Sequence, residues 1–261
     1  MKNDLTDTTF IIPIRLDTVV RLENLLLCVE HLLEWFQTHI VVLEAAPYNN
    51  GFIQKLLGDR VTYRFVEDKD PVYHRTKYLN KMTREVKTDF IGIWDADVIV
   101  EHEQILDSIH QLRQNVCDIA YPYDGDFFDT SDLLRNHYVV HRDLGFLKAN
   151  RGKMKLLYKV EGEIGAVGGA IFAETDKYRL AGMENETFYG WGLEDGERYY
   201  RWLSFDFSIY RSKGCLFHLT HPRDANWLST SNSHLEKARH DLNEIVNYTK
   251  EELYSWFAPK E

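Results

Sequence analysis

The chain has 261 residues, of which 44% are hydrophobic and 13% aromatic, so it is long enough to bury the core of one large domain. Its formal net charge of −10 argues against general nucleic-acid binding, which requires a basic surface. The N-terminus is polar and unlike a signal peptide, no segment has the length and hydrophobicity of a membrane span, and the three cysteines are widely spaced. These features predict a cytoplasmic protein whose membrane association is at most peripheral, at the inner face.

The first half of the chain alternates short apolar runs with segments of helical spacing. Strands are predicted at 9–15, 40–44 and 61–66, and helices at 19–36, 52–57 and 73–87. This alternation predicts an α/β fold with a mostly parallel central sheet flanked by helices. The sequence contains neither a Gly-x-Gly-x-x-Gly pattern nor a Walker loop, which argues against a classical dinucleotide or ATP site.

Two carboxylates follow the apolar run 90–94, which reads as a buried strand. In open α/β sheets ligands bind beyond the carboxyl ends of the strands, where Asp95 and Asp97 would lie. Because like charges repel, a hard divalent cation that carries a phosphate ligand would suit this pair. An ordinary acidic turn is the alternative. Arg75 and Lys77 precede this strand and would contact a phosphate or nucleoside, or else belong to a solvated helix face.

The middle of the chain is less regular. A helix is predicted at 103–114 and a strand at 118–123. The segment 124–159 then mixes glycine, aspartate and aromatic residues, and predicts a flexible or acceptor-contacting insertion. A pair of surface helices with solvated lysines is the alternative. Its basic cluster consists of Arg142, Lys148, Arg151, Lys153, Lys155 and Lys159.

A glycine-rich strand is predicted at 165–172, and glycine inside a strand often marks the close approach of a ligand. Further on, Trp191 stands between two glycines and offers a flat ring on which a sugar could pack. Glu194 and Asp195 follow where a helix is expected to start, at 196–203. The helix dipole favours an ionised carboxylate there, which suits a general base. An ordinary acidic helix cap is the alternative.

The last motif contains His218 and His221, which follow an apolar run. Imidazole is the commonest nitrogen ligand for transition metals, so the pair is a candidate metal-binding motif. A capping box then predicts a C-terminal helix over 233–258 that serves packing.

Taken together, these motifs resemble inverting, metal-dependent glycosyltransferases of the GT-A fold, and in particular the β-1,4-galactosyltransferase and chondroitin-polymerase branch (glycosyltransferase family 2-like). The order and approximate spacing agree from residue 9 to about 224. The segments that carry the resemblance are Pro13 with Arg15, Arg75-x-Lys77-x-Leu79-Asn80, Asp95-Ala96-Asp97, Gly168-Gly169, Gly190-Trp191-Gly192-Leu193-Glu194-Asp195 and His221-x-Arg223-Asp224. Two positions depart from the family pattern, because Leu193 replaces a glycine and His218 replaces a methionine ligand of the animal enzymes.

The resemblance implies a single GT-A domain over residues 1–261. Its nucleotide-binding half would span about 1–124 and its acceptor and metal half about 160–230. Asp97, His218 and His221 would hold Mn²⁺ or Mg²⁺, Asp195 would be the base, and Glu194 would position the sugars. The residues implied in donor binding are Pro13, Arg15, Arg75, Lys77, Asp95 and Asp97, and those implied in acceptor or sugar binding are Gly168, Gly169, Trp191 and Gly192.

The activity implied is transfer of galactose or an N-acetylhexosamine from a UDP-sugar to a saccharide hydroxyl. Three alternatives have different signatures. A retaining transferase would not need Asp195 as a base, a nucleotidyltransferase would use the same pair of aspartates, and a silent sugar-nucleotide or glycan-binding module would bind without turnover.

Overall fold

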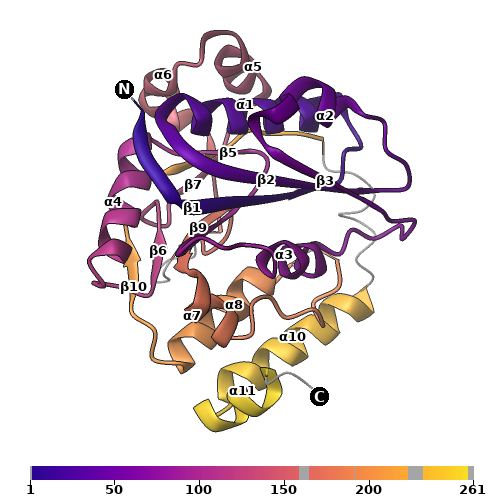
Figure 1. Cartoon of the computed structure of the whole chain (residues 1–261), viewed down its shortest axis with the longest axis vertical. Coiled ribbons are helices and arrows are strands. Elements are labelled where there is room, and N and C mark those ends of the chain that lie inside the picture. The colour runs from indigo at the N-terminus through magenta and orange to yellow at the C-terminus, as the bar shows by residue number, and fades with distance from the viewer. Residues whose placement is uncertain (1, 159–164, 191, 223–231, 258–261) are drawn as a thin grey trace.

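The computed structural model describes residues 2–158, 165–190, 192–222 and 232–257, with the side chains of 232–235 excepted. Its main sheet has seven strands in the order β10-β6-β9-β4-β1-β2-β3 (Figure 1). All neighbouring strands are parallel except those that flank β9, which runs antiparallel to β4 and to β6. The predicted mostly parallel sheet is therefore confirmed.

The elements follow one another as the sequence patterns predict through most of the first half. The strands of the main sheet are β1 (Asn3–Ile14), β2 (Phe36–Ala46), β3 (Thr62–Glu67), β4 (Phe90–Trp94), β6 (Ile119–Tyr121), β9 (Ala170–Glu174) and β10 (Ile209–Arg211). The helices are α1 (Val19–Trp35), α2 (Phe52–Leu57), α3 (Arg75–Thr83), α4 (His102–Arg113), α5 (Asp132–His141), α6 (Leu144–Ala149), α7 (Thr175–Leu180), α8 (Glu194–Ser204), α10 (Asn232–Asn247) and α11 (Lys250–Phe257), with short 3₁₀ turns at Gly58–Arg60 and Arg151–Lys153.

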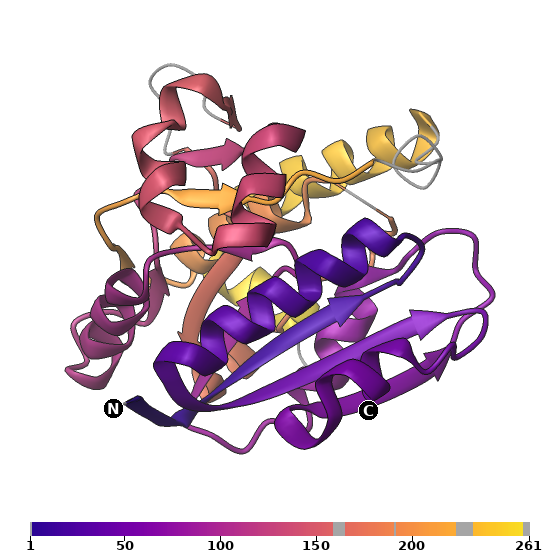
Figure 2. The same cartoon turned by 90° about the horizontal axis from the view of Figure 1, so that it is seen from above.

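Helices cover both faces of the parallel part of the sheet. Figure 1 shows α1 and α2 on one side of β1–β3 and α3 on the other, and Figure 2 shows α1 lying along these strands. Because both faces are covered, the end of β1 is buried as a continuous run from Phe10 to Ile14 instead of alternating. This buried run positions the carboxyl ends of β1 and β4 next to each other.

A second sheet of four strands, in the order β5-β11-β7-β8, was not predicted from the sequence. It consists of β5 (Val98–Ile99), β7 (Phe127–Asp129), β8 (Lys155–Leu157) and β11 (Leu216–His218). Its strands have only two or three residues each, too few to show a period in the sequence. The sheet matters for the site because β11 pairs with β5 just after Asp97, and with β7 so that His218 lies opposite Asp129.

The segment 124–159 contains the two helices α5 and α6 between the short strands β7 and β8. Two of its basic side chains are paired on the surface: Lys148 lies 2.8 Å from Glu101, and Arg142 lies 3.1 Å from Glu30. These two contacts favour the alternative of surface helices, whereas Lys159 lies outside the described residues. An acceptor contact by this segment stays a prediction.

The C-terminal region has two helices where the sequence predicted one. The chain leaves α10 at Asn247 and starts again at Thr249, whose backbone N–H and hydroxyl donate to the Glu252 carboxylate at 2.8 and 3.0 Å. The Glu252 N–H donates back to the Thr249 hydroxyl at 3.3 Å, which completes a capping box that begins α11. Residue 258 lies outside the described residues.

None of the described helices combines the length and apolarity that crossing a bilayer would require. Cys28, Cys117 and Cys215 are all buried and form no disulfide.

Candidate metal and catalytic site

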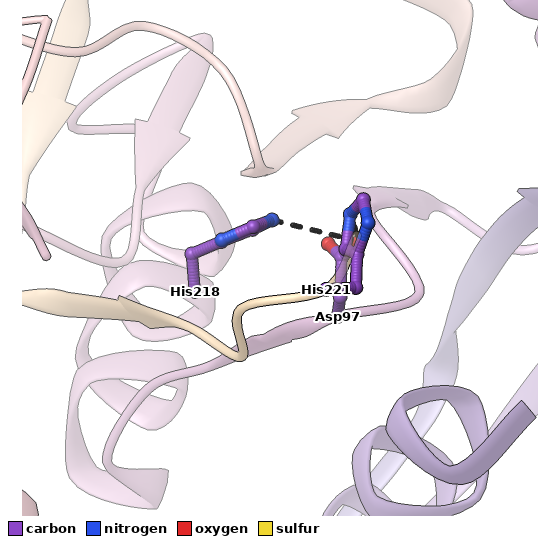
Figure 3. A group of neighbouring side chains, drawn as sticks. All are labelled: Asp97, His218 and His221. Carbon is purple, nitrogen blue, oxygen red and sulfur yellow. Dashed lines mark ion pairs between the residues drawn. The ribbon is translucent and has the colours of Figure 1, made fainter. Parts of the chain in front are cut away.

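Three of the predicted site residues converge from distant parts of the chain. Asp97 follows β4, whereas His218 ends β11 and His221 lies three residues further on. The Nε2 atoms of the two histidines lie 3.6 and 3.2 Å from the same oxygen, Oδ2 of Asp97 (Figure 3). The donor atoms of all three side chains lie within 4.8 Å of one another. One carboxylate oxygen and two imidazole nitrogens are a donor set that suits Mn²⁺ and other divalent metals.

The orientation of both imidazoles is fixed by their other nitrogen. Nδ1 of His218 lies 2.8 Å from Oδ1 of Asp129. Nδ1 of His221 lies 2.9 Å from the carbonyl oxygen of Pro222, which can only accept a hydrogen bond. Nδ1 of His221 therefore donates to this carbonyl, and Nε2 is the ring nitrogen that faces Asp97. Such partners of the second nitrogen are a regular feature of metal-binding histidines.

Charge balance in this cluster favours a cation. Burial alone would lower the pKa of His218, but the carboxylates of Asp97 and Asp129 outweigh it and raise the pKa to about 9. Burial would likewise raise the pKa of Asp97, but the two imidazoles hold it well below its usual range. Without a metal, His218 is thus protonated and ion-paired with Asp97 at neutral pH. A divalent cation held by Asp97, His218 and His221 could replace that proton and supply the positive charge that balances Asp97.

Arg75 joins the aspartate after β4 to the start of α8. Its Nη2 lies 2.5 Å from Oδ1 of Asp95, and its Nη1 lies 3.7 Å from Oδ1 of Asp195. The side chain of Arg75 is only 14% exposed, so solvent weakens these contacts little. The candidate donor-side carboxylates and the candidate base therefore belong to one site.

The start of α8 differs in detail from the sequence prediction, which placed Glu194 and Asp195 before the helix. The helix begins at Glu194, and Leu193 is its N-cap with a left-handed φ of 70°. A left-handed conformation costs a residue with a Cβ about 1–2 kcal/mol, which explains why glycine suits this position. Oε2 of Glu194 accepts a hydrogen bond of 2.7 Å from the Gly192 N–H. Burial, followed by the charge of Asp195, raises the pKa of Glu194 to about 7.

The paired glycines stand between β4 and α8. The Gly169 carbonyl accepts a hydrogen bond of 2.8 Å from the Asp95 N–H, and the Gly168 carbonyl accepts one of 2.6 Å from the Tyr123 hydroxyl. A Cβ atom at Gly168 would overlap Oδ2 of Asp195. The glycine thus lets the backbone approach the candidate base closely.

The remaining predicted donor residues lie in different surroundings. Pro13 is buried in β1 opposite Leu43, and Lys77 is exposed on α3, with its ammonium 5.8 Å from the centre of the Tyr78 ring. Arg15 donates from Nε to the Ala45 carbonyl, from Nη1 to the carbonyls of Asp70 and Pro71, and from Nη2 to the Asp68 carboxylate, at 2.7–3.2 Å. These contacts bind β2 to the loop 68–71, and a donor contact of these three residues stays a prediction.

Three residues of the motifs that carry the resemblance lie outside the described part of the chain, namely Trp191, Arg223 and Asp224. Two residues of the described site were missed by sequence reasoning, namely Asp129 and Arg198. Asp129 follows two apolar residues, as Asp95 follows a longer apolar run, and this pattern could have identified Asp129 from the sequence. Arg198 stands one helical turn after Asp195, a spacing that permits an ion pair on any helix and so points to no particular role.

Comparison with known proteins gives one family match, over part of the chain. The family model described as the N-terminal domain of galactosyltransferase matches residues 147–224, a segment that contains Gly168, Asp195, His218 and His221 but not Asp97. No curated protein sequence matches the chain significantly.

Solved structures similar to the chain cover most of it at low sequence identity. Glucosyl-3-phosphoglycerate synthase from Mycobacterium tuberculosis, in complex with Mn²⁺, UDP and phosphoglyceric acid, has a TM-score of 0.54 and 12% identity, and the match covers 90% of this chain and 78% of that one. The catalytic domain of Drosophila β1,4-galactosyltransferase 7, in complex with xylobiose, has a TM-score of 0.50 and 15% identity, with 89% and 79% covered. Residues 1–349 of S. aureus TarS have a TM-score of 0.60 and 11% identity, with 96% and 66% covered.

These likenesses show that the chain has the GT-A fold. Together with the family match, they support its assignment as a glycosyltransferase of the GT-A type.

Proposed function

We propose that the protein transfers a sugar, galactose or an N-acetylhexosamine, from a UDP-sugar to a saccharide hydroxyl with inversion at the anomeric carbon. The observation that carries the proposal is the position of Arg75, which contacts both Asp95 and Asp195. The proposal is supported because Asp195 and Asp95, which follows β4, both lie within ion-pair distance of the same guanidinium. Two similar structures are complexes with ligands of the classes that the proposal requires, one with UDP and Mn²⁺ and the other with xylobiose.

Asp97, His218 and His221 would hold the divalent cation, for which Mn²⁺ and Mg²⁺ are the candidates. When bound, the cation neutralises negative charge on the diphosphate as it leaves. Arg75 supplies a further positive charge next to Asp95, and Asp129 keeps Nε2 of His218 directed at Asp97. These residues bind and orient the donor.

Asp195 acts on the acceptor in this proposal. The acceptor oxygen attacks the anomeric carbon from the face opposite the diphosphate, and the bond between that carbon and the phosphate oxygen breaks with its electron pair going to UDP. The hydroxyl proton passes to Asp195. Glu194 and Gly192 shape the turn that leads into α8, so they fix the position from which Asp195 acts. Much of the rate in such a displacement comes from positioning.

The test is a donor screen. UDP release is measured for a panel of UDP-hexoses and UDP-N-acetylhexosamines with Mn²⁺, with and without simple saccharide acceptors. We expect acceptor-dependent release with one donor, abolished by EDTA and restored by Mn²⁺. Binding of UDP-sugars without turnover would favour the silent module, and EDTA-resistant transfer would contradict the metal assignment. NMR of the first product distinguishes inversion from retention.

A further inference from the structure

A buried arginine lies directly behind the candidate base. Arg198 is one turn after Asp195 on α8, and its side chain is 0% exposed. Nη2 of Arg198 lies 2.6 Å from Oδ1 of Asp195. At this distance, and with the guanidinium itself shielded from water, the contact is a strong charge-assisted hydrogen bond. Arg198 therefore fixes one oxygen of the Asp195 carboxylate.

The other side of the guanidinium is fixed by Glu184, which lies in the loop before α8. Nη1 of Arg198 lies 2.6 Å from Oε1 of Glu184, and the same oxygen accepts a hydrogen bond of 2.7 Å from the Tyr178 hydroxyl. The backbone of Glu184 is tied to Asn80 of α3 by hydrogen bonds of 2.8 and 2.9 Å. The Trp202 ring lies 5.3 Å from the guanidinium carbon. Both terminal nitrogens of the Arg198 guanidinium are thus held by carboxylates.

The two oxygens of Asp195 face different surroundings. Both guanidinium contacts, from Arg198 and from Arg75, are made to Oδ1. Oδ2 lies against the α-carbon of Gly168, where any side chain would overlap it. Anchoring Oδ1 therefore fixes the position of Oδ2, which lies beside the backbone of Gly168.

Charge also decides what this arrangement does. An arginine paired with Asp195 alone would stabilise the ionised carboxylate and so make it a weaker base. Glu184 shares the guanidinium of Arg198 with Asp195, and Asp95 likewise shares that of Arg75. The three carboxylates and two arginines together keep a net charge of −1. A buried ion pair is in itself weak evidence for a contribution to stability, because well-packed apolar side chains of similar volume often stabilise a protein as much or more.

We propose, on the basis of the function proposed above, that Arg198 is a positioning residue for that reaction. It holds Oδ1 so that Oδ2 faces the acceptor hydroxyl, and Glu184 offsets its charge so that Asp195 remains a base. The neighbouring Arg201 offers a matched control. It lies on the same helix, is equally buried and is ion-paired with Glu197 at 2.6 Å, but it has no contact with Asp195 among the described residues.

The first experiment compares Arg198→Lys with Arg201→Lys, using the UDP-sugar and acceptor that turn over fastest in the donor screen. Lysine keeps the charge but cannot bridge two carboxylates with a planar fork. We expect kcat of Arg198→Lys to fall by about 10- to 100-fold, because misplacement by an ångström costs about that much. The KM for the UDP-sugar should stay within about twofold of the wild type, since the residue acts on the acceptor side. Arg201→Lys should retain kcat.

The second experiment is the pH profile of kcat for Glu184→Gln. Glutamine keeps the shape of the side chain but removes its negative charge, so that the charge of Arg198 is no longer shared between Glu184 and Asp195. We expect the acidic limb of the profile to move to lower pH and the plateau to fall. A residue that only supports packing would not move this limb, and this variant decides the question if Arg198→Lys fails to fold.

Equal losses of kcat in Arg198→Lys and Arg201→Lys, or an unshifted acidic limb in Glu184→Gln, would overturn the positioning role of Arg198 but leave the proposed function standing. A wild-type protein that transfers no sugar from any donor would overturn the proposed function and this inference with it.

Discussion

The two nitrogens of the His218 imidazole each face a carboxylate, with Asp129 2.8 Å from Nδ1 and Asp97 3.6 Å from Nε2. Such a second partner fixes the ring and raises the basicity of the ligating nitrogen. Asp129→Ala should therefore weaken Mn²⁺ binding by about 10- to 100-fold. Titration of Mn²⁺ followed by electron paramagnetic resonance measures this. Asp132→Ala, which changes an exposed carboxylate three residues away, is the control and should bind normally. Unchanged affinity in Asp129→Ala would mean that His218 does not depend on this partner.

Glu194 should make stability depend on pH. Its folded-state pKa of about 7 lies above the ordinary value of 4.5. A raised carboxyl pKa means that the folded protein prefers the protonated form, so this contribution is complete below 4.5 and is lost as pH rises through about 7. Between these pH values, the free energy of unfolding should therefore decline less in Glu194→Gln than in the wild type. Urea denaturation at a series of pH values measures it.

The control for this experiment is Glu103→Gln, since Glu103 is also in the first turn of a helix but its side chain is 68% exposed. Its pH dependence should match that of the wild type. If the free energy of unfolding of Glu194→Gln also has the pH dependence of the wild type, the carboxyl group of Glu194 is not the cause of that dependence.

Gly168 should be sensitive to the smallest substitution. In Gly168→Ala the new methyl group would overlap Oδ2 of Asp195, so the carboxylate or the backbone must shift. We expect kcat to fall by about 10²-fold, the cost of an ångström of misplacement, with little change in donor affinity. Steady-state kinetics measure both. Gly196→Ala on α8 introduces the same methyl group into open space and should be nearly neutral. Normal turnover in Gly168→Ala would show that Asp195 tolerates displacement.

The parts of the fold that could be predicted from the sequence are those decided within a few neighbouring residues. The helical spacing of 19–36 and the apolar run 90–94 identified α1 and β4 almost to the residue. The polar groups at the end of that run identified Asp95 and Asp97, because the ends of parallel strands meet at one edge. His218 and His221 were proposed in the same way, from the end of the apolar run that forms β11 and the residues after it.

The parts that could not be predicted depend on pairing between distant segments. Asp129 reaches His218 only because β7 lies parallel to β11, 89 residues further along the chain. Short strands such as these are defined by their partners and not by their own pattern. The role of Arg198 depends likewise on Glu184, whose loop is held by Asn80 of α3. No local feature of either residue indicates that contact.

The most direct test of the account compares Asp97→Asn with Asp195→Asn, because the two carboxylates are given different tasks. The measurement is the affinity for the UDP-sugar in the presence of Mn²⁺, together with kcat. Asp195→Asn should lower kcat by about 10²- to 10⁴-fold, the usual contribution of a general base, with donor affinity nearly unchanged. Asp97→Asn should lose donor binding along with turnover, because it removes the negative charge that both His218 and His221 face and that would hold the cation. Near-normal kcat in Asp195→Asn, or loss of donor binding in that variant, would contradict the account.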